Sequence, residues 1–255
     1  MKFSLKTLAA AVVMAAAATG AQADIVTGTG GNGELFFNIW DANGSYTRGL
    51  NVQINGFETG LATAGNLDMM WASDSLLDSW LAAADVATLK WNIVANDTQG
   101  ANRLLTTYTA PEATTTKANN VIRSAGAAVT TFLGSVNTAM PNVAGSSVAV
   151  DSGSAAYAGK STFKDTINGF LNFSNAGTLA NDSFASGLGF MRIDALATGT
   201  AASVYNEYMD GSAVNVWLDS ANTLHIAAVP EPSEYAMLLA GLGMIGFMAR
   251  RNKRA

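Results

Sequence analysis

The sequence predicts a mainly β domain with helical decoration, an α+β fold built on an antiparallel sheet or a β-sandwich. Three pairs of alternating apolar segments around turn-forming residues indicate β-hairpins, and one long apolar stripe with a period of 3.6 indicates a helix. Regular strand–helix alternation, which is typical of a doubly wound parallel sheet, is not found. We expect this domain to span residues 24–228, between an N-terminal signal peptide (1–23) and a C-terminal segment (229–255) that holds a short transmembrane helix.

The N-terminus has the three-part pattern of a secretory signal. Lys2 and Lys6 form a basic start, an apolar run extends over Leu8–Ala18, and Ala21-Gln22-Ala23 is typical of a cleavage site. As a helix, this run spans about 16 Å, which is too short for the ~30 Å hydrocarbon core of a bilayer. We therefore expect Sec-type export, cleavage by signal peptidase after Ala23, and a mature chain that begins at Asp24.

Strands are predicted from alternating apolar side chains and from the turns between them. The Asn43-Gly44 pair between two such runs is the strongest short-range hairpin signal in the chain. The expected strand pairs are Glu34–Asp41 with Tyr46–Ile54, Leu89–Ile93 with Arg103–Thr109, and Val214–Leu218 with Leu224–Ile226. A further strand is expected at Leu188–Leu196.

Helices are expected where apolar residues recur every three or four positions. The best case is Lys117–Thr138, which Pro141 follows. A short helix after Ser73 or Asp74 is expected to bury Leu76, Leu77, Trp80 and Leu81. A third is expected at Thr162–Asn172, with Phe163, Ile167, Phe170 and Leu171 on one face. By contrast, Gly28-Thr29-Gly30-Gly31 is expected to be a flexible leader, because it lacks the spacing of a nucleotide-binding loop.

Composition argues against several classes of function. Residues 24–228 hold 8 Lys and Arg against 17 Asp and Glu, a net charge of −9, so no basic patch is available for a nucleic acid. The chain has no Cys and a single His, which excludes Cys₂His₂ zinc sites, thiol nucleophiles and disulfides. No cofactor and no metal ion is expected.

No catalytic residue is expected either. His225 lies opposite Leu224 and Ile226 in its strand pattern, which predicts that it faces solvent, and no G-x-S-x-G nucleophile motif accompanies it. Asp74 and Asp78 share one helix face. We expect Asp74 to cap the helix and Asp78 to be a solvated carboxylate on its surface. The segments Asp41–Gly44 and Asp210–Ser212 weakly resemble calcium-binding loops. They lack the ligand spacing of an EF-hand, so we expect them to be turns.

Two tryptophans are candidate glycan-contacting residues. Trp40 and Trp217 lie on the strand face opposite the better apolar set, beside Asn38 and Asn215. Such a side chain can stack on a sugar ring, although a second packed sheet would bury it equally well. Trp80 and Trp91, which fall on apolar faces, are expected in the core.

The C-terminus combines three parts in a fixed order. First comes Val229-Pro230-Glu231-Pro232, in which two prolines keep the backbone extended. Fifteen uncharged, mostly apolar residues follow at Tyr235–Ala249, about 22 Å as a helix. A basic cluster then holds the cytoplasmic end by the positive-inside rule, formed by Arg250, Arg251, Lys253 and Arg254.

This segment resembles the PEP-CTERM sorting domain of exported bacterial proteins. The resemblance covers about 27 residues and implies recognition by an exosortase, a membrane-embedded transpeptidase-like enzyme, with cleavage near Pro230-Glu231-Pro232. It also implies a Gram-negative host that makes extracellular polysaccharide. The alternative is a plain C-terminal membrane anchor.

The leading functional hypothesis is an exported, noncatalytic protein that passes transiently through the inner membrane to the cell surface or the extracellular matrix. There it would be associated with exopolysaccharide in a biofilm. The alternatives are a carbohydrate-binding or adhesive module and, behind it, an extracytoplasmic hydrolase with two carboxylates in a cleft.

The signal peptide makes a direct prediction. Protein isolated from its native host should begin at Asp24, because the Ala21-Gln22-Ala23 pattern presents two small residues to signal peptidase. N-terminal sequencing or mass spectrometry of the intact protein measures this. A chain that still begins at Met1 would contradict the prediction.

Overall fold

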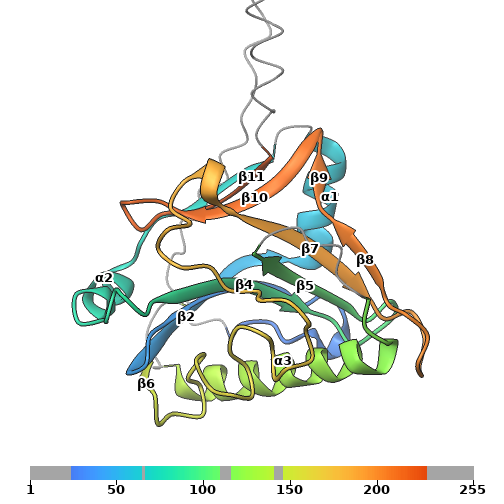
Figure 1. Cartoon of the computed structure of the whole chain (residues 1–255), viewed down its shortest axis with the longest axis horizontal. Coiled ribbons are helices and arrows are strands. Elements are labelled where there is room, and N and C mark those ends of the chain that lie inside the picture. Colours follow the sequence, from blue (N-terminus) through green and yellow to red (C-terminus); the bar gives the residue numbers. More distant parts are fainter. Residues whose placement is uncertain (1–23, 65–66, 110–115, 141–145, 229–255) are drawn as a thin grey trace, which may run out of the picture.

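The computed structural model describes residues 24–64, 67–109, 116–140 and 146–228, and the signal and C-terminal segments lie outside them (Figure 1). Eleven strands form one sheet in which every pairing is antiparallel. In chain order they are β1 (Glu34–Trp40), β2 (Gly44–Gln53), β3 (Asp68–Trp71), β4 (Lys90–Asn96), β5 (Arg103–Tyr108), β6 (Ser147–Asp151), β7 (Leu188–Asp194), β8 (Val204–Glu207), β9 (Met209–Asp210), β10 (Ser212–Leu218) and β11 (Leu224–Ala228). The helices are α1 (Ile54–Ala64), α2 (Ser75–Leu81) and α3 (Asn119–Ala139), with 3₁₀ turns at Gly28–Gly30 and Phe184–Ser186.

All three predicted hairpins are confirmed. Strand β1 pairs with β2, β4 with β5, and β10 with β11, and β7 occupies the further predicted strand. The order across the sheet is β3-β11-β10-β7-β5-β4-β1-β2-β6, with β8 and β9 paired to β7 and β10. Strand β7 thus joins the C-terminal hairpin to the two N-terminal ones.

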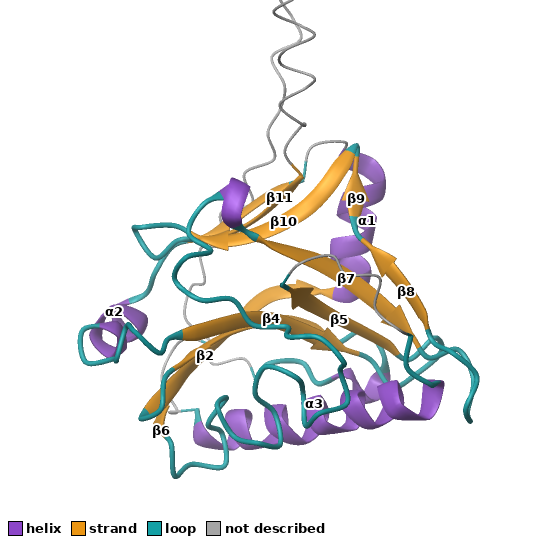
Figure 2. Ribbon diagram, viewed as in Figure 1, coloured by secondary structure: helices purple, strands orange, loops and turns teal. Residues whose placement is uncertain are grey.

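The sheet curls into a half-barrel, as Figures 1 and 2 show. Strands β2 and β3 lie near opposite ends of the strand order, yet their segments are in contact. The Trp71 indole Nε1 donates to the Leu50 carbonyl at 3.0 Å, and the Arg48 Nη1 donates to the Ala72 carbonyl at 2.7 Å. Of the two predicted architectures, the described residues therefore form one strongly curved sheet rather than a sandwich of two.

Two hydrophobic cores occupy the two faces of this sheet. The first fills the inside of the curl and is closed by α1 and α2, while α3 covers the second on the outer face. Strand β1 is buried along its whole length because its alternate side chains enter different cores. Phe37 and Ile39 belong to the first, and Phe36 and Trp40 belong to the second.

The long helix α3 confirms the prediction for Lys117–Thr138. Its buried residues follow the expected stripe: Ile122, Ala125, Val129, Phe132, Leu133 and Val136. This stripe packs on β4, β5, β6 and β7 (Figure 2). In the described part of the chain, no helix is both long and apolar enough to cross a membrane.

The prediction of a helix at Thr162–Asn172 is wrong. This segment is a series of turns, in which Ile167, Asn168 and Gly169 have consecutive positive φ angles of 41°, 56° and 74°. A right-handed helix cannot contain such a run. The apolar spacing nevertheless marked buried side chains correctly, since Phe163 stacks on Phe132 with ring centroids 3.9 Å apart.

The flexible leader predicted at Gly28–Gly31 is also wrong. Ile25 is buried in the second core, and its backbone N–H and carbonyl both bond the Asn137 amide of α3 at 3.0 Å. Gly28 is packed so closely that a Cβ on it would lie 1.9 Å from the Asn96 carbonyl oxygen. The glycine is therefore a point of close backbone approach rather than of flexibility.

Helix α1 was not predicted. The expected strand Tyr46–Ile54 ends at Gln53, and the chain turns directly into the helix. Ile54 and Phe57 are buried, and Leu61 packs on the same core, which is a helical spacing. Gly56 and Gly60 lower the helix propensity and obscure this signal.

Curling of the sheet leads to a prediction about Trp71. Trp71→Phe should lower the free energy of unfolding by about 1–3 kcal/mol, because the buried Leu50 carbonyl loses its indole donor. Urea unfolding followed by circular dichroism measures the change. Trp217→Phe is the matched control, since its indole N–H has no acceptor among the described residues. Equal effects of the two substitutions would contradict the role given to this hydrogen bond.

Candidate functional site

Strand β11 ends where the predicted sorting segment begins. Ala228 pairs with Val214 of β10, and its N–H donates to the Leu67 carbonyl at 3.1 Å. Val229, Pro230, Glu231 and Pro232, the basic residues Arg250, Arg251, Lys253 and Arg254, and the cleavage-site residues Ala21 and Ala23 all lie outside the described residues. Along the chain, Pro230 is two residues beyond a hydrogen-bonded strand.

Trp40 does not reach the surface. Only 5% of the residue is exposed, and it belongs to the second core. A Cβ on Gly159 would lie 2.8 Å from Trp40 Cδ1, so the loop after β6 packs directly on the indole. The burial alternative therefore holds for this residue, and its ring is not accessible to a glycan.

Trp217 is half-buried and belongs to a small aromatic cluster. Its ring stacks on His225 with centroids 4.6 Å apart and planes inclined by 2°, and Phe184 meets it edge-on at 5.5 Å. The His225 Nε2 lies 3.0 Å from an Asp219 carboxylate oxygen. His225 lies on the face opposite Leu224 and Ile226, as predicted, but Trp217 and Asp219 partly cover its side chain, of which 14% is exposed.

The turn and cap carboxylates have the predicted roles. Asp74 caps α2 by accepting from the Leu77 N–H at 2.8 Å, and its other oxygen accepts from the Tyr46 hydroxyl at 2.6 Å. Asp78, one turn further along the helix, accepts a hydrogen bond from the Ser73 hydroxyl. Gly211, with φ of 78°, makes the turn between β9 and β10, and Asp210 accepts from the Leu67 N–H at 2.6 Å.

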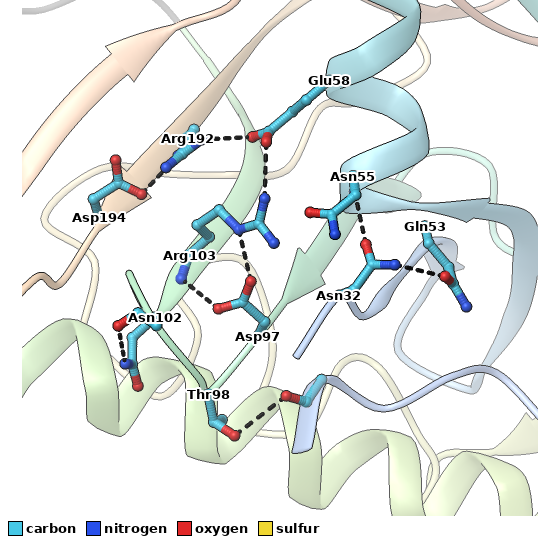
Figure 3. A network of polar contacts seen from close by, with 12 residues as sticks. Asn32, Gln53, Asn55, Glu58, Asp97, Thr98, Asn102, Arg103, Arg192 and Asp194 are labelled. Atoms are coloured by element: carbon cyan, nitrogen blue, oxygen red, sulfur yellow. Dashed lines mark hydrogen bonds and ion pairs between the residues drawn. The ribbon is translucent and has the colours of Figure 1, made fainter. Parts of the chain in front are cut away.

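A network of charged side chains holds α1 to the sheet (Figure 3). Glu58 of α1 pairs with Arg103 of β5 at 2.8 Å and with Arg192 of β7 at 2.9 Å. Each arginine is completed by a neighbouring carboxylate, Asp97 for Arg103 and Asp194 for Arg192, both at 2.6 Å. These five residues are called the Glu58 network below.

The Glu58 network is mutually satisfied. The Tyr208 hydroxyl also donates to Glu58 at 2.8 Å, and burial, followed by the Glu58 charge, raises the pKa of Tyr208 well above its ordinary value. A shallow depression of about 530 Å³ lies over the network, lined by Glu58, Leu61, Arg192, Asp194, Asn206, Tyr208 and Met209. Because the two guanidinium groups already hold carboxylates, the network stabilises the position of α1 rather than offering a free acid or base.

A second hollow, of about 300 Å³, lies between the β1–β2 turn, α2 and β6. Trp80, Asn43, Asp41 and Asp151 surround it, and its remaining lining residues are Gly44, Ala83, Ala84, Ala149 and Val150. We call it the Trp80 groove. Trp80 was expected in the core, and it does pack against the first core, but it is only partly buried and also lines this groove.

Gly44 brings the indole of Trp80 close to the backbone. A Cβ at this position would lie 3.3 Å from Trp80 Nε1 and 2.6 Å from the Val150 carbonyl oxygen. Glycine therefore allows both α2 and the edge strand β6 to approach the turn. The sequence showed the Asn43-Gly44 turn, but it placed Trp80 in the core, and neither the partial exposure of Trp80 nor its proximity to the turn could be inferred from it.

Asp41 forms the buried floor of the groove. Its carboxylate accepts from the backbone N–H groups of Asn43, Gly44 and Asp85 at 2.7–2.9 Å. Burial opposes ionisation, but these hydrogen bonds outweigh it and lower the pKa of Asp41 below its ordinary value of 3.8. In the described part of the chain, no three His, Cys, Asp or Glu side chains gather as they would to hold a metal ion.

Residues 228–254 match the family model of the PEP-CTERM protein-sorting motif. The resemblance seen in Pro230-Glu231-Pro232, the apolar run and the basic tail is therefore confirmed. This motif implies export and sorting at the membrane toward the cell surface by an exosortase-type system. No curated protein and no solved structure is significantly similar to the chain.

The lowered pKa of Asp41 predicts an acid-sensitive contribution to stability. Asp41→Asn should cost about 1–3 kcal/mol at neutral pH, because an amide N–H replaces an oxygen that accepts a backbone hydrogen bond. A carboxyl with a lowered pKa stabilises the folded state fully above its ordinary value and loses that effect as the pH falls through its folded-state pKa. The difference between wild type and variant should therefore shrink below pH 3.8.

Urea unfolding of both proteins across this pH range tests the prediction. The matched control is Asp68→Asn, an exposed aspartate for which no side-chain partner is described. It should change stability little at any pH. An Asp41→Asn effect that stays constant into strong acid would show that its carboxylate charge is not involved.

Proposed function

We propose that this protein is a noncatalytic component of the cell surface or extracellular matrix that is associated with exopolysaccharide in a biofilm. The observation that carries the proposal is the sorting motif at residues 228–254. Sec-type machinery would export the chain, and signal peptidase would cleave it after Ala23. The exosortase would act while the C-terminal segment is transiently in the inner membrane. The basic cluster supports a stop at this depth, because each cation costs about 2.5–3.5 kcal/mol to bring to the bilayer centre.

The roles of the carboxylates support a noncatalytic domain. Burial raises the pKa of Glu34, but this residue accepts hydrogen bonds from the Val26 and Asn51 N–H groups and so ties the N-terminal segment to β2. Asp97 and Asp194 are held by arginines of the Glu58 network. Each of these carboxyl groups already holds a segment of the fold in place, which is a structural role rather than a catalytic one.

Two alternatives come from other classes. An extracytoplasmic hydrolase would place two carboxylates across a substrate cleft. A carbohydrate-binding or adhesive module would present aromatic and polar side chains to a glycan. Trp217 stays a candidate for this second role, although His225 and Phe184 already contact its ring. Trp80 is the more specific observation in favour of a binding module.

Processing tests the sorting half of the proposal. In a host that contains the exosortase, the mature protein should lose at least Tyr235–Ala255, because the prolines hold the preceding segment extended and open to the enzyme. Immunoblots of cells with and without the exosortase should show a shift of about 2 kDa, given 26.3 kDa for 255 residues. Glu231→Ala should impair cleavage while leaving membrane insertion intact.

Replacing Arg250, Arg251, Lys253 and Arg254 by Gln should let the tail slip through the bilayer and reduce processing. Lys164→Gln is the control, because it removes an exposed cation from the domain rather than from the tail. If the tail persists unchanged in the active host, a simple C-terminal anchor replaces the sorting proposal.

A further inference from the structure

We propose that the Trp80 groove is a carbohydrate subsite that binds a neutral or amino sugar of a polysaccharide chain. The inference rests on the proposed function only in that export would bring the protein into contact with extracellular polysaccharide. Binding itself depends on the groove and is independent of processing.

The groove offers an aromatic surface with room beside it. Trp80 packs against the first core together with Leu76 and Leu81, which fixes the position of its indole. On the groove side its neighbours Ala83, Ala84 and Ala149 are small, which leaves a volume of about 300 Å³. This lies at the lower end of the ~300–1,000 Å³ range of ligand pockets and suits one sugar ring better than a drug-sized molecule.

Polar groups converge on the same space. Asp151 is exposed on the edge strand β6, and no described residue donates a hydrogen bond to its carboxylate. The Trp80 indole N–H likewise has no acceptor among the described residues. Asn43 points its amide nitrogen at Asp41, 3.4 Å away, which leaves its amide oxygen for a ligand. One donor and several acceptors beside the Trp80 indole suit a sugar ring, which carries hydroxyl groups on its edge and C–H groups on its faces.

Charge narrows the class of sugar. Asp41 and Asp151 both line the groove, and the pKa of Asp41 is lowered, so its carboxylate stays ionised at neutral pH. The domain around them has a net charge of −9. An anionic polysaccharide rich in uronate or sulfate would be repelled, whereas a neutral sugar or a protonated amino sugar is compatible with both carboxylates.

The groove lies away from Ala228, the last described residue before the sorting segment. Helix α2 follows β3 at Trp71, which pairs with Leu224 at the start of β11. The chain leaves the domain at the other end of that strand, at Ala228, and Figure 1 shows α2 projecting to one side of the sheet. A protein tethered or sorted through its C-terminus would therefore keep the Trp80 groove open to extracellular material.

Binding to three polysaccharides tests the proposal. The probes are a neutral glucan, chitosan at mildly acidic pH, and polygalacturonate, each immobilised on beads and mixed with mature protein purified from its host. We expect the protein to sediment with the glucan beads and with the chitosan beads, and not with the polygalacturonate beads. Trp80→Ala should weaken binding at least tenfold, and Trp80→Tyr should keep part of it because an aromatic face remains. Asp151→Asn should weaken chitosan binding more than glucan binding.

Leu196→Ala, at an exposed apolar residue outside the groove, is the control and should bind as wild type does. Trp217→Ala tests the alternative glycan-contacting residue and should also retain binding. Circular dichroism and the urea midpoint report whether Trp80→Ala is folded. If it is not, Ala149→Leu fills the groove without replacing the indole and should abolish binding by itself. Unchanged binding by Trp80→Ala or Ala149→Leu, loss of binding in Trp217→Ala, equal binding to polygalacturonate, or no binding to any of the three probes would each overturn the proposal. Detergent-solubilised full chain serves equally if the tail is not cleaved, so a failure of sorting and a failure of binding are distinguishable.

Discussion

The hydrogen bond from the Trp71 indole to the Leu50 carbonyl joins two strands that lie near opposite ends of the sheet order. Such a contact exists only because the sheet is strongly curved, and the curvature has two consequences. It encloses the first core, which draws apolar side chains from most of the strands and from α1 and α2. It also leaves a convex outer face, which has to be covered separately by α3 and by the loop that contains Phe163. A flat sheet with the same strands would leave one of these apolar sets in water.

Charged residues reinforce this arrangement at its edges. The Glu58 network anchors α1 across β5 and β7, and Asp41, Asp74 and Asp219 satisfy backbone N–H groups at turns or at a helix start. Hydrogen bonds from the Asp85, Gly44 and Asn43 N–H groups keep Asp41 ionised although burial opposes it. In a domain with a net charge of −9, such hydrogen bonds stabilise the ionised carboxylates and offset part of the cost of their mutual repulsion.

The two ends of the C-terminal hairpin lead to different parts of the chain. At one end Ala228 is held by β10 and by Leu67, and the sorting motif begins there. At the other end β11 starts beside Trp71, which leads into α2 and the Trp80 groove. Sorting and the proposed ligand binding can therefore be tested separately by substitutions in distant parts of the chain.

The sequence by itself determined what depends on local pattern. The hairpins follow from alternation and turn residues, α3 follows from its apolar stripe, and the sorting motif follows from the order of prolines, apolar run and basic tail. Tertiary structure alone decided which half-apolar side chains are covered. The sequence pattern favoured exposure for Trp40 and burial for Trp80, yet the loop at Gly159 covers Trp40, while a gap between Gly44, Ala84 and Ala149 leaves Trp80 partly open. The same holds for Thr162–Asn172, whose apolar spacing marked burial but not conformation, because positive φ angles at Ile167 and Asn168 fit the chain over the second core. Burial depends on segments that are distant in sequence, and no local period carries that information.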